Sequence, residues 1–465
     1  MIPKYEHPAA PIAADWPALN TATGASSTAG TTAGASLPAA DIEWQSFFSE
    51  PKLQQLIEAS LRNNRDLRVA VLNIEQARAQ YQIRRADQLP TLNAAFIGAR
   101  QPSATGSGSI SSLYSAGLGV TSYELDFFGR VASLKEAALS QYLATEEGRK
   151  SAQISLIASV ANTYLSLLAD EELLAITQQT LDTRVESLRL GKLRFDNGVT
   201  SELDYRQAES LTEAARVAYA QTVRQRALDQ NLLTLLLGQP LAGDLAVALP
   251  AGKGLADMAL MADVPAGLPS DLLTRRPDVR QAEQQLLASN ANIGAARAAF
   301  FPRITLTGSA GSASNRLSNL FNSGTFGWTF APQLVLPIFD VGRNNANLDA
   351  ARVGRDIAVA QYEKSIQTAF REVADALAGR ATLSEQLRAQ QAQASAEAVR
   401  YKLAGLRYES GIASSLDALD AQRSLFAVQQ AVVQTRLAQL QSQVTLYKTL
   451  GGGWKDAIST PLISP

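Results

Sequence analysis

A repeat of the chain against itself is the feature that most constrains its fold. Residues Arg65-Asp66 to Leu89-Pro90 realign with Pro277-Asp278 to Phe301-Pro302 at an offset of 212 positions. Four further landmarks realign at an offset of 213: Arg194 to Val199 with Arg407 to Ile412, Gly129-Arg130 with Gly342-Arg343, Leu203-Asp204 with Leu416-Asp417, and Leu237-Gly238 with Leu450-Gly451. Chance similarity between two alanine-rich and glutamine-rich stretches would not keep the offset constant. We therefore infer one unit of about 175 residues that occurs twice.

Apolar residues at every seventh position predict a very long helix in each unit. In the first unit they are Val160, Leu167, Leu174, Leu181, Leu188 and Phe195, and in the second Val373, Leu387, Ala394, Tyr401 and Tyr408, with Arg380 as an exception. This spacing is typical of a coiled-coil seam. A helix from Arg130 to Asn197 would be about 100 Å long at about 1.5 Å per residue.

Each long helix is expected to end at a glycine turn and to be followed by an antiparallel helix. Gly198 and Gly411 can adopt the left-handed conformation that ends a helix. Ser201 and Ser414 precede an aspartate by three positions, which is the spacing with which serine caps the first turn of a new helix. The sequence thus predicts helical hairpins over about 130–237 and about 343–450.

Alternating runs ahead of each long helix predict β-strands. We expect them over about 91–101, 113–126, 303–312 and 325–338, and such a length crosses a bilayer as a tilted strand. Phe326, Trp328 and Phe330 alternate with small residues, and we interpret these aromatic residues as a lipid-facing wall. Four strands cannot close a barrel, because about eight is the smallest number that does. The chain must therefore oligomerise, unless the strands form a small ordinary sheet.

The remaining segments complete the predicted domain organisation. The two repeats occupy 41–238 and 275–450, and they are joined by a connector rich in glycine and proline over 239–274. Residues 1–40 are expected to form an extended arm, because residues 18–40 are too weakly apolar to make a core. Residues 451–465 form a C-terminal tail.

Composition excludes several classes of function. The 42 Lys and Arg residues balance 43 Asp and Glu residues, so a nucleic-acid partner is not expected. The chain has no cysteine and one histidine, His7, which argues against metal sites and most enzymes; no motif for a nucleotide cofactor is found either. We expect no catalytic residue, metal or cofactor. No run of about 18 apolar residues occurs, which excludes a membrane helix on length. No signal peptide is visible, so the chain is either cytoplasmic or a processed form.

Several long strings resemble the TolC family of bacterial outer-membrane efflux factors, and in particular its OprM-like lipoprotein branch. They are Ala266 to Leu273, Arg275-Arg276-Pro277-Asp278, Ala295 to Pro302, Glu124 to Arg130, and Leu419 to Leu425. The resemblance extends over nearly the whole chain, from Ile2-Pro3 to Trp454. Members of this branch carry a lipidated cysteine shortly before a pattern like Ile2-Pro3-Lys4-Tyr5. We expect that the native protein has this lipid anchor, although its cysteine is absent here.

The resemblance implies an α+β membrane protein that assembles as a homotrimer. Four strands per chain would form a twelve-stranded outer-membrane β-barrel, continued by a long periplasmic α-helical coiled-coil barrel with the connector in an equatorial belt. Such a channel is a passive exit duct for drugs and other small organic compounds. Its implied partners are outer-membrane lipid, a periplasmic adaptor protein and an inner-membrane pump, which we expect to be driven by protons.

The resemblance also implies two sets of site residues. A periplasmic gate would be formed by Leu416 and Asp420, with Leu203 and Gln207 as their counterparts in the first repeat. Three copies of Asp420 near an axis would attract cations or favour partial protonation. Adaptor docking would involve the hairpin tips, namely Arg194, Gly198, Val199, Ser201, Arg407, Gly411, Ile412 and Ser414. Turn formation and capping explain the tip residues equally well, and Arg423 could be the simple intrahelical partner of Asp420.

Two alternative functions stay open at this point. One is a TolC-like exit duct for secreted proteins or for metal ions, although a path for metal ions would favour more Met, His and Cys than the three Met and one His of this chain. The other is a soluble coiled-coil scaffold with two small β-hairpins.

Overall fold

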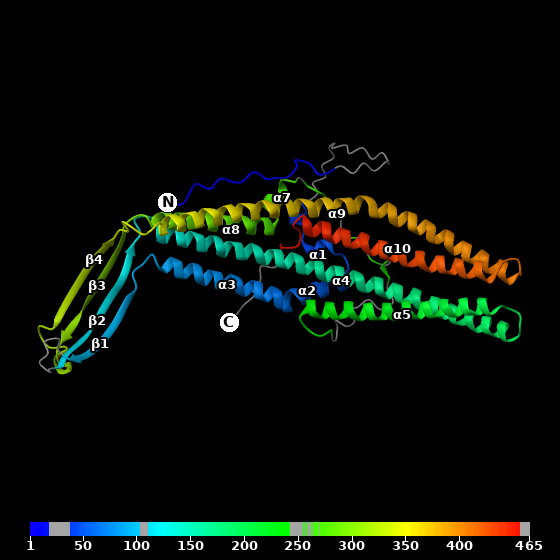
Figure 1. Cartoon of the computed structure of the whole chain (residues 1–465), viewed down its shortest axis with the longest axis horizontal. Coiled ribbons are helices and arrows are strands. Elements are labelled where there is room, and N and C mark those ends of the chain that lie inside the picture. The colour runs from blue at the N-terminus through cyan, green and yellow to red at the C-terminus, as the bar shows by residue number, and fades with distance from the viewer. Residues whose placement is uncertain are drawn as a thin grey trace. The chain divides into compact units, whose positions relative to one another are not determined.

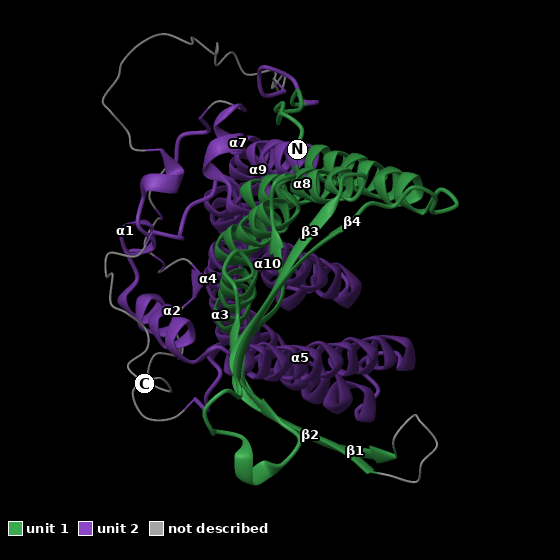
Figure 2. Cartoon of the chain, turned by 90° about the vertical axis from the view of Figure 1, so that its left-hand side faces the viewer, with its two compact units in different colours: residues 1–10, 72–147, 280–365 green, residues 11–71, 148–279, 366–465 purple. Residues whose placement is uncertain are grey.

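The computed structural model describes residues 1–17, 38–102, 110–241 and 254–455, without 256–257, 259–260, 262–263 and 268. The chain divides into two compact units (Figure 2). Unit 1 comprises residues 1–10, 72–147 and 280–365, and unit 2 comprises the rest of the chain. Parts of the predicted arm, connector and tail lie outside the described residues.

Unit 1 contains one antiparallel sheet with the strand order β1-β2-β3-β4 (Figure 1). The strands are β1 (Leu92–Pro102), β2 (Ile110–Leu125), β3 (Arg303–Ser314) and β4 (Phe326–Val335). The central pair joins the two sequence repeats, because β2 belongs to the first and β3 to the second. Gly117 lies opposite Gly311 in this pair, and a Cβ atom on Gly311 would lie 2.3 Å from the carbonyl oxygen of Ala116. Among the described strands, β1 and β4 each have one unpaired edge.

The observed strands differ by a few residues from the predicted ones. β4 ends at Val335 and not at 338, because its partner β3 begins at Arg303, which pairs with Val335 and follows Pro302. β2 begins three residues earlier than expected, since Ile110 still pairs with Pro102.

The helices follow the two repeats in the same order. The long helices are α4 (Arg130–Asp196) and α9 (Arg343–Glu409), with 67 residues each, and their antiparallel partners are α5 (Glu202–Leu237) and α10 (Ser415–Thr449). α3 (Arg65–Ala86) and α8 (Pro277–Ala298) precede the strands. Shorter elements are η1 (Ala39–Asp41), α1 (Trp44–Phe47), α2 (Pro51–Asn63), α7 (Asp271–Arg275) and η3 (Leu317–Asn319).

The predicted seven-residue seam is buried or half-buried along unit 2, with the exception of Arg380. Val160 and Val373 are fully buried, and Leu167 and Leu387 are 4% and 8% exposed. Arg380, the charged exception, is exposed and donates a hydrogen bond to the carbonyl oxygen of Val264 at 2.8 Å.

The expectation that no helix could span a membrane was too strict. α4 contains an 18-residue window that is long and apolar enough by composition, with a mean hydropathy of 1.3. However, 72% of that window is buried inside the protein, as in the core helix of a soluble domain. Small and polar residues interrupt its apolar runs, which is why a search for uninterrupted apolar residues missed it.

A short helix fixes the end of α5 in unit 2. The side chains of Ser60 and Asn64 both donate hydrogen bonds to the carbonyl oxygen of Leu236, at 2.7 and 2.9 Å. Gly238 then ends α5 in the left-handed conformation, with φ of +66°. Elsewhere in the unit, Tyr447 of α10 stacks on Phe47 with ring centroids 4.0 Å apart.

Candidate functional sites at the hairpin tips and on the strands

Both helical hairpins turn through the same backbone motif. After α4, Gly198 adopts φ of +70°, its amide donates to the carbonyl of Phe195 at 2.8 Å, and the amide of Val199 donates to the carbonyl of Arg194 at 2.9 Å. This pair of bonds is a Schellman motif, which satisfies the last carbonyl groups of a helix. The second tip repeats it: Gly411 has φ of +73°, its amide donates to Tyr408 at 3.0 Å, and the amide of Ile412 donates to Arg407 at 2.9 Å.

The predicted serine caps are confirmed. The hydroxyl oxygen of Ser201 accepts a hydrogen bond from the amide of Asp204 at 3.2 Å, and that of Ser414 accepts one from the amide of Asp417 at 3.4 Å. Each bond satisfies an amide in the first turn of α5 or α10, which has no partner within its own helix. Turn formation and capping are therefore real roles of the tip residues.

The tips nevertheless expose more apolar surface than a turn requires. Val199 and Ile412 are 73% and 70% exposed, and Leu203 and Leu416, in the first turns of α5 and α10, are 68% and 56% exposed. Arg194 and Arg407 are exposed beside them. Apolar side chains gathered on an exposed surface and rimmed by polar residues mark an interaction site.

Asp204 joins the two hairpins within one chain. Its carboxylate accepts hydrogen bonds from the hydroxyls of Ser415 and Ser201, both at 2.7 Å, and from Thr200 at 3.0 Å. These bonds, the one from Ser415 first, lower the pKa of the Asp204 carboxyl. Sequence reasoning assigned Asp204 only to the cap of its own helix, and its repeat partner Asp417 gives no sign of a link between the hairpins.

A second link between the tips involves a predicted docking residue. Arg194 donates a hydrogen bond to the hydroxyl of Tyr408 at 2.5 Å, and its guanidinium lies 5.3 Å from the centre of the Tyr408 ring. Arg194 and Tyr408 come from different repeats, so the sequence could not place them together.

Asp420 lies between two arginine side chains in unit 2. Its Oδ2 atom accepts a hydrogen bond from Arg400 of α9 at 2.7 Å, and its Oδ1 atom accepts one from Arg423 of α10 at 2.6 Å. The intrahelical partner that the sequence suggested is thus confirmed. Within one chain, the bond from Arg400 and the charge of Arg423 lower the pKa of the Asp420 carboxyl. The effect of three copies of Asp420 near the axis stays a prediction.

The four predicted gate residues occupy equivalent positions on two helices. Leu203 and Gln207 lie one turn apart on α5, as Leu416 and Asp420 do on α10, so each pair lies on one face of its helix. Gln207 is half-buried. Among the described residues, no group of three or more His, Cys, Asp or Glu side chains could hold a metal ion.

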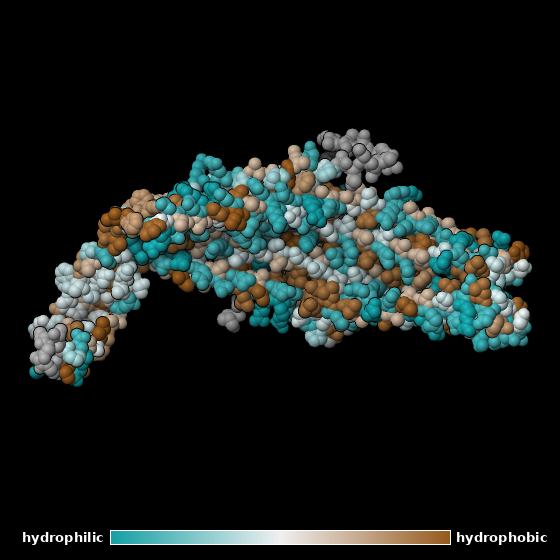
Figure 3. Space-filling view, in the orientation of Figure 1, coloured by the Kyte–Doolittle hydropathy of each residue, from teal (hydrophilic) through white to brown (hydrophobic). Residues whose placement is uncertain are grey.

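The aromatic residues of β4 share one face of the sheet. Phe326, Trp328 and Phe330 are 71%, 73% and 62% exposed, and successive side chains of a strand point to opposite faces. Thr329 lies on the other face, where its hydroxyl is 2.7 Å from that of Ser309. The sheet therefore has an apolar face and a polar face along β4. Figure 3 shows further apolar surface where the strands meet the helices of unit 1. Ile338, Phe339 and Val341, which lie between β4 and α9 in the sequence, are exposed.

Comparison with known proteins identifies the family. The sequence profile described as "Outer membrane efflux protein" matches residues 56–239 and again 268–452. The chain belongs to this family. The double match has the same offset as the internal repeat.

Relatives resemble the chain along almost its whole length. The antibiotic efflux pump outer membrane protein ArpC of Pseudomonas putida is 51% identical over 98% of this chain and 93% of the relative. The toluene efflux pump outer membrane protein TtgC, also of Pseudomonas putida, shows the same identity and coverage. The open-state crystal structure of the MtrE outer membrane channel of Neisseria gonorrhoeae is 42% identical and superposes with a TM-score of 0.86 over 98% of both chains.

These findings confirm the predicted fold class and location. The protein is a trimeric outer-membrane β-barrel with four strands from each chain, continued by an α-helical barrel. It is an efflux channel of the bacterial outer membrane that extends into the periplasm. The soluble coiled-coil scaffold, which the sequence alone had left open, is thereby wrong.

Proposed function

We propose that this channel is the exit duct of a tripartite pump that exports antibiotics, solvents and other small organic compounds. The observation that carries the proposal is the 51% identity, over 98% of the chain, to outer membrane proteins named for antibiotic and toluene efflux pumps. A passive duct needs an energy source elsewhere. An inner-membrane pump driven by protons would supply the energy, and a periplasmic adaptor protein would connect this pump to the channel.

Export and assembly can be tested together. Deletion of the gene should remove resistance to toluene and to small antibiotics, and complementation with the intact gene should restore it. The purified protein in detergent should have the mass of about three copies of the 49.6 kDa chain. A trimer that restores no resistance would refute the substrate class. Protection against copper or silver ions instead would favour the metal-ion duct, and recovery of a secreted protein would favour the secretion duct.

The exposed apolar tips support adaptor docking. Val199 and Ile412, with the polar tip residues Arg194, Ser201, Arg407 and Ser414 around them, would form the contact surface, and Gly198 and Gly411 would shape it. Replacing Val199 or Ile412 by Asp places a charge on a surface that must lose water on docking, which costs several kcal/mol unless the charge is paired. We expect resistance to be lost while the trimer and its thermal stability persist.

Matched variants separate docking from turn formation. Val199→Thr keeps the shape of the side chain, and Ile412→Val keeps its apolar character, so both should retain resistance. Unchanged resistance in the Asp variants, with normal expression, would remove the tips from the docking surface.

The pairing of Asp420 supports a role in closing the tube. Its bond to Arg400 joins α10 to α9 one turn from Leu416, and its bond to Arg423 holds the carboxylate in place within α10. Leu203 and Gln207 would complete the closure on α5. Asp420→Ala should loosen this closure and raise the uptake of a large antibiotic that an intact outer membrane excludes. The control is Glu397→Gln, because Glu397 also pairs with Arg400, at 3.0 Å, but is not a predicted gate residue. Equal uptake in the two variants would contradict the gate.

Lipid contact is proposed for the apolar face of β4. The stripe of Phe326, Trp328 and Phe330 has the alternation of a strand with one face in hydrocarbon and the other toward a polar interior.

A further inference from the structure

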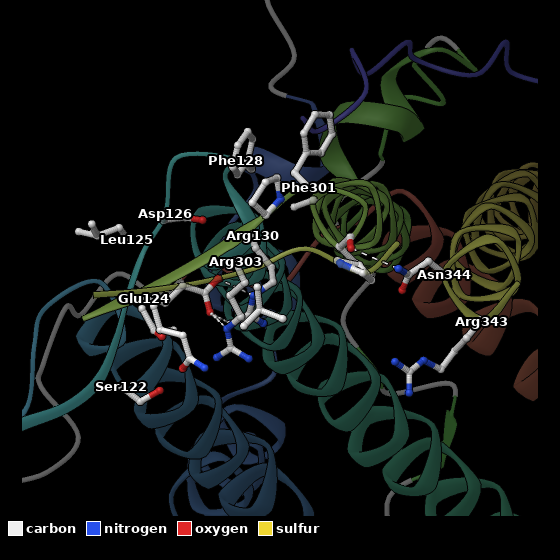
Figure 4. A pocket seen from close by; sticks show the side chains of 17 residues that line it. Ser122, Glu124, Leu125, Asp126, Phe128, Arg130, Phe301, Arg303, Arg343 and Asn344 are labelled. Carbon is white, nitrogen blue, oxygen red and sulfur yellow. Dashed lines mark hydrogen bonds and ion pairs between the residues drawn. The ribbon is translucent and has the colours of Figure 1, made fainter. Parts of the chain in front are cut away.

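A cavity of about 450 Å³ lies in unit 1, where β2 and β4 end, β3 begins, and the long helices α4 and α9 begin (Figure 4). Its charged lining consists of Glu124, Asp126, Arg130, Arg303 and Arg343. Three positive charges thus face two negative charges. No functional role was expected for these side chains from the sequence, in which Glu124 to Arg130 carry part of the family resemblance and Arg130 and Arg343 mark the repeat.

A buried carboxylate fixes two of the arginines. The side chain of Glu124 is only 10% exposed. Its Oε1 atom accepts a hydrogen bond from Nε of Arg130 at 2.8 Å and its Oε2 atom one from Nη2 at 2.6 Å, while Nε of Arg303 lies 2.7 Å from Oε2. One carboxylate therefore neutralises only half of the charge of two guanidinium groups, and it holds both in defined positions.

The third arginine lacks such a partner. Arg343 is exposed and, among the residues that the structure describes, forms no ion pair. Figure 4 shows it apart from the cluster around Glu124. Neither nearby carboxylate forms an ion pair with Arg343: Asp126 accepts hydrogen bonds from the amides of Val131 and Ala132, and Asp340 accepts them from the amides of Gly342 and Asn344.

The internal repeat shows how this difference arises. Arg343 corresponds to Arg130, since Gly342-Arg343 realigns with Gly129-Arg130. The position that corresponds to Glu124 is Pro337. The second repeat thus keeps the arginine and replaces its carboxylate by a residue that has no charge, which leaves a cation at the mouth of the cavity.

The cavity opens on the polar face of the sheet. Glu124 lies opposite Thr305, and Thr305 lies opposite Gln333. Gln333 is on the same face of β4 as Thr329 and therefore faces away from the aromatic stripe. If the aromatic stripe contacts lipid, as the proposed function requires, the cavity opens to the interior of the channel.

We propose that this cavity binds anionic groups of solutes in transit, namely carboxylates and phosphates. Arg343 supplies the unneutralised charge, and Arg303 and Arg130 supply donors that Glu124 holds in place. Guanidinium groups bind carboxylates and phosphates through paired N–H donors, and rings of arginine favour anions in pores. Three copies of the site in the trimer make such a ring. The inference rests on the proposed channel for its place in the transport path.

Protection from chemical modification tests the binding directly. Phenylglyoxal modifies accessible arginines, and mass spectrometry of the purified trimer in detergent reports the rate at each position. Inorganic phosphate at twice its dissociation constant should slow modification of Arg343 about three-fold. Arg316 is the internal control, because it is exposed, lies between β3 and β4 and forms no ion pair among the described residues. Equal protection of both arginines, or of neither, would overturn the site.

Ion selectivity in a planar lipid bilayer tests whether the cavity lies on the transport path. In a potassium chloride gradient, Arg343→Gln should shift the reversal potential toward the equilibrium potential of potassium. The permeability ratio of chloride to potassium should fall about two-fold. Arg316→Gln should shift it less. Protection of Arg343 without any change in reversal potential would overturn transit through the site. Because the proposed gate closes the wild-type tube, both arginine variants are compared in the Asp420→Ala background. Absence of conductance in that background would refute the proposed channel, and the phosphate experiment would still decide the binding.

Discussion

The pKa of one buried carboxyl group predicts an unusual pH dependence of stability. Asp170 lies on α4 with 5% of its surface exposed, and its Oδ2 atom has no hydrogen-bond partner among the described residues. Burial, together with a hydrogen bond to Asp229 and repulsion by Asp229 and Glu171, raises the pKa of Asp170 from 3.8 to about 7, and Arg226 opposes this shift. Arg226 itself bonds to Glu171 at 2.5 Å.

The direction of the effect follows from proton binding. Between about pH 4 and pH 7 the folded protein holds a proton on Asp170 that the unfolded chain has released. The contribution to stability is therefore complete below this window, falls as pH rises through it, and is lost above it. A shift of about three pKa units corresponds to about 4 kcal/mol at most. Since Asp229 shares the titration, we expect about 2 kcal/mol between pH 5 and pH 8.

The variant Asp170→Asn tests this reasoning. Asparagine has the same shape and no charge, so the variant should be more stable than the wild type at pH 8, and the difference should shrink toward pH 5. The measurement is thermal unfolding of the detergent-solubilised protein, followed by circular dichroism at four pH values. Glu186→Gln, an exposed carboxylate on the same helix, is the control. A difference between Asp170→Asn and wild type that does not grow with pH would refute the argument.

The second repeat provides a natural comparison for this cluster. Leu383 and Ser442 occupy the positions that correspond to Asp170 and Asp229. Gln439 and Ser384 replace Arg226 and Glu171, and Gln439 donates a hydrogen bond to Ser384 at 3.0 Å where the first repeat has an ion pair. The same helical packing is thus built without titrating groups, and we expect no pH dependence from it.

Two further predictions concern backbone and membrane. Gly238→Ala should destabilise the protein by more than about 2 kcal/mol, because φ of Gly238 is positive and a Cβ atom would lie 2.3 Å from the carbonyl oxygen of Asn63. Gly198 also has a positive φ, but a Cβ atom there meets nothing within 4 Å, so Gly198→Ala should cost only about 1 kcal/mol. Thermal unfolding compares the two variants, and equal losses of stability would contradict the clash. Trp328→Arg should reduce the amount of folded barrel in the outer membrane, with a cost of about 2–4 kcal/mol if the residue is near the bilayer centre. Thr329→Arg, on the other face of β4, should be tolerated. Heat-modifiable migration in gels measures the folded fraction, and a larger loss in Thr329→Arg than in Trp328→Arg would mean that the two faces are assigned the wrong way round.

The sequence predicted the parts of the fold that depend on local signals. Gly198 ends its helix through its own backbone conformation, and Ser201 caps the next helix through its own side chain, so a short stretch of sequence is enough to find both. The strands were found because their alternation has a simple period. Their ends were missed by a few residues, since the pairing of Arg303 with Val335 is decided by another strand.

The contacts between repeats could not be predicted in the same way. Asp204 bonds to Ser415 across 211 positions of sequence, and Arg194 bonds to Tyr408 across 214 positions. α3 was not identified as a helix, because apolar residues such as Val69 and Ile83 are exposed within one chain and give no clear face toward its own core. The role of such residues can be predicted only when the neighbouring subunits of the trimer are considered.

The two open edges of the sheet have a genetic consequence. Because β1 and β4 must each pair with a neighbouring chain to close the barrel, a chain with a damaged edge strand inactivates every trimer that contains it. In a cell that makes both forms, the number of intact channels falls with the cube of the wild-type fraction when the copies mix at random. Edge-strand mutations should therefore be dominant, whereas mutations that prevent a chain from assembling at all should be recessive.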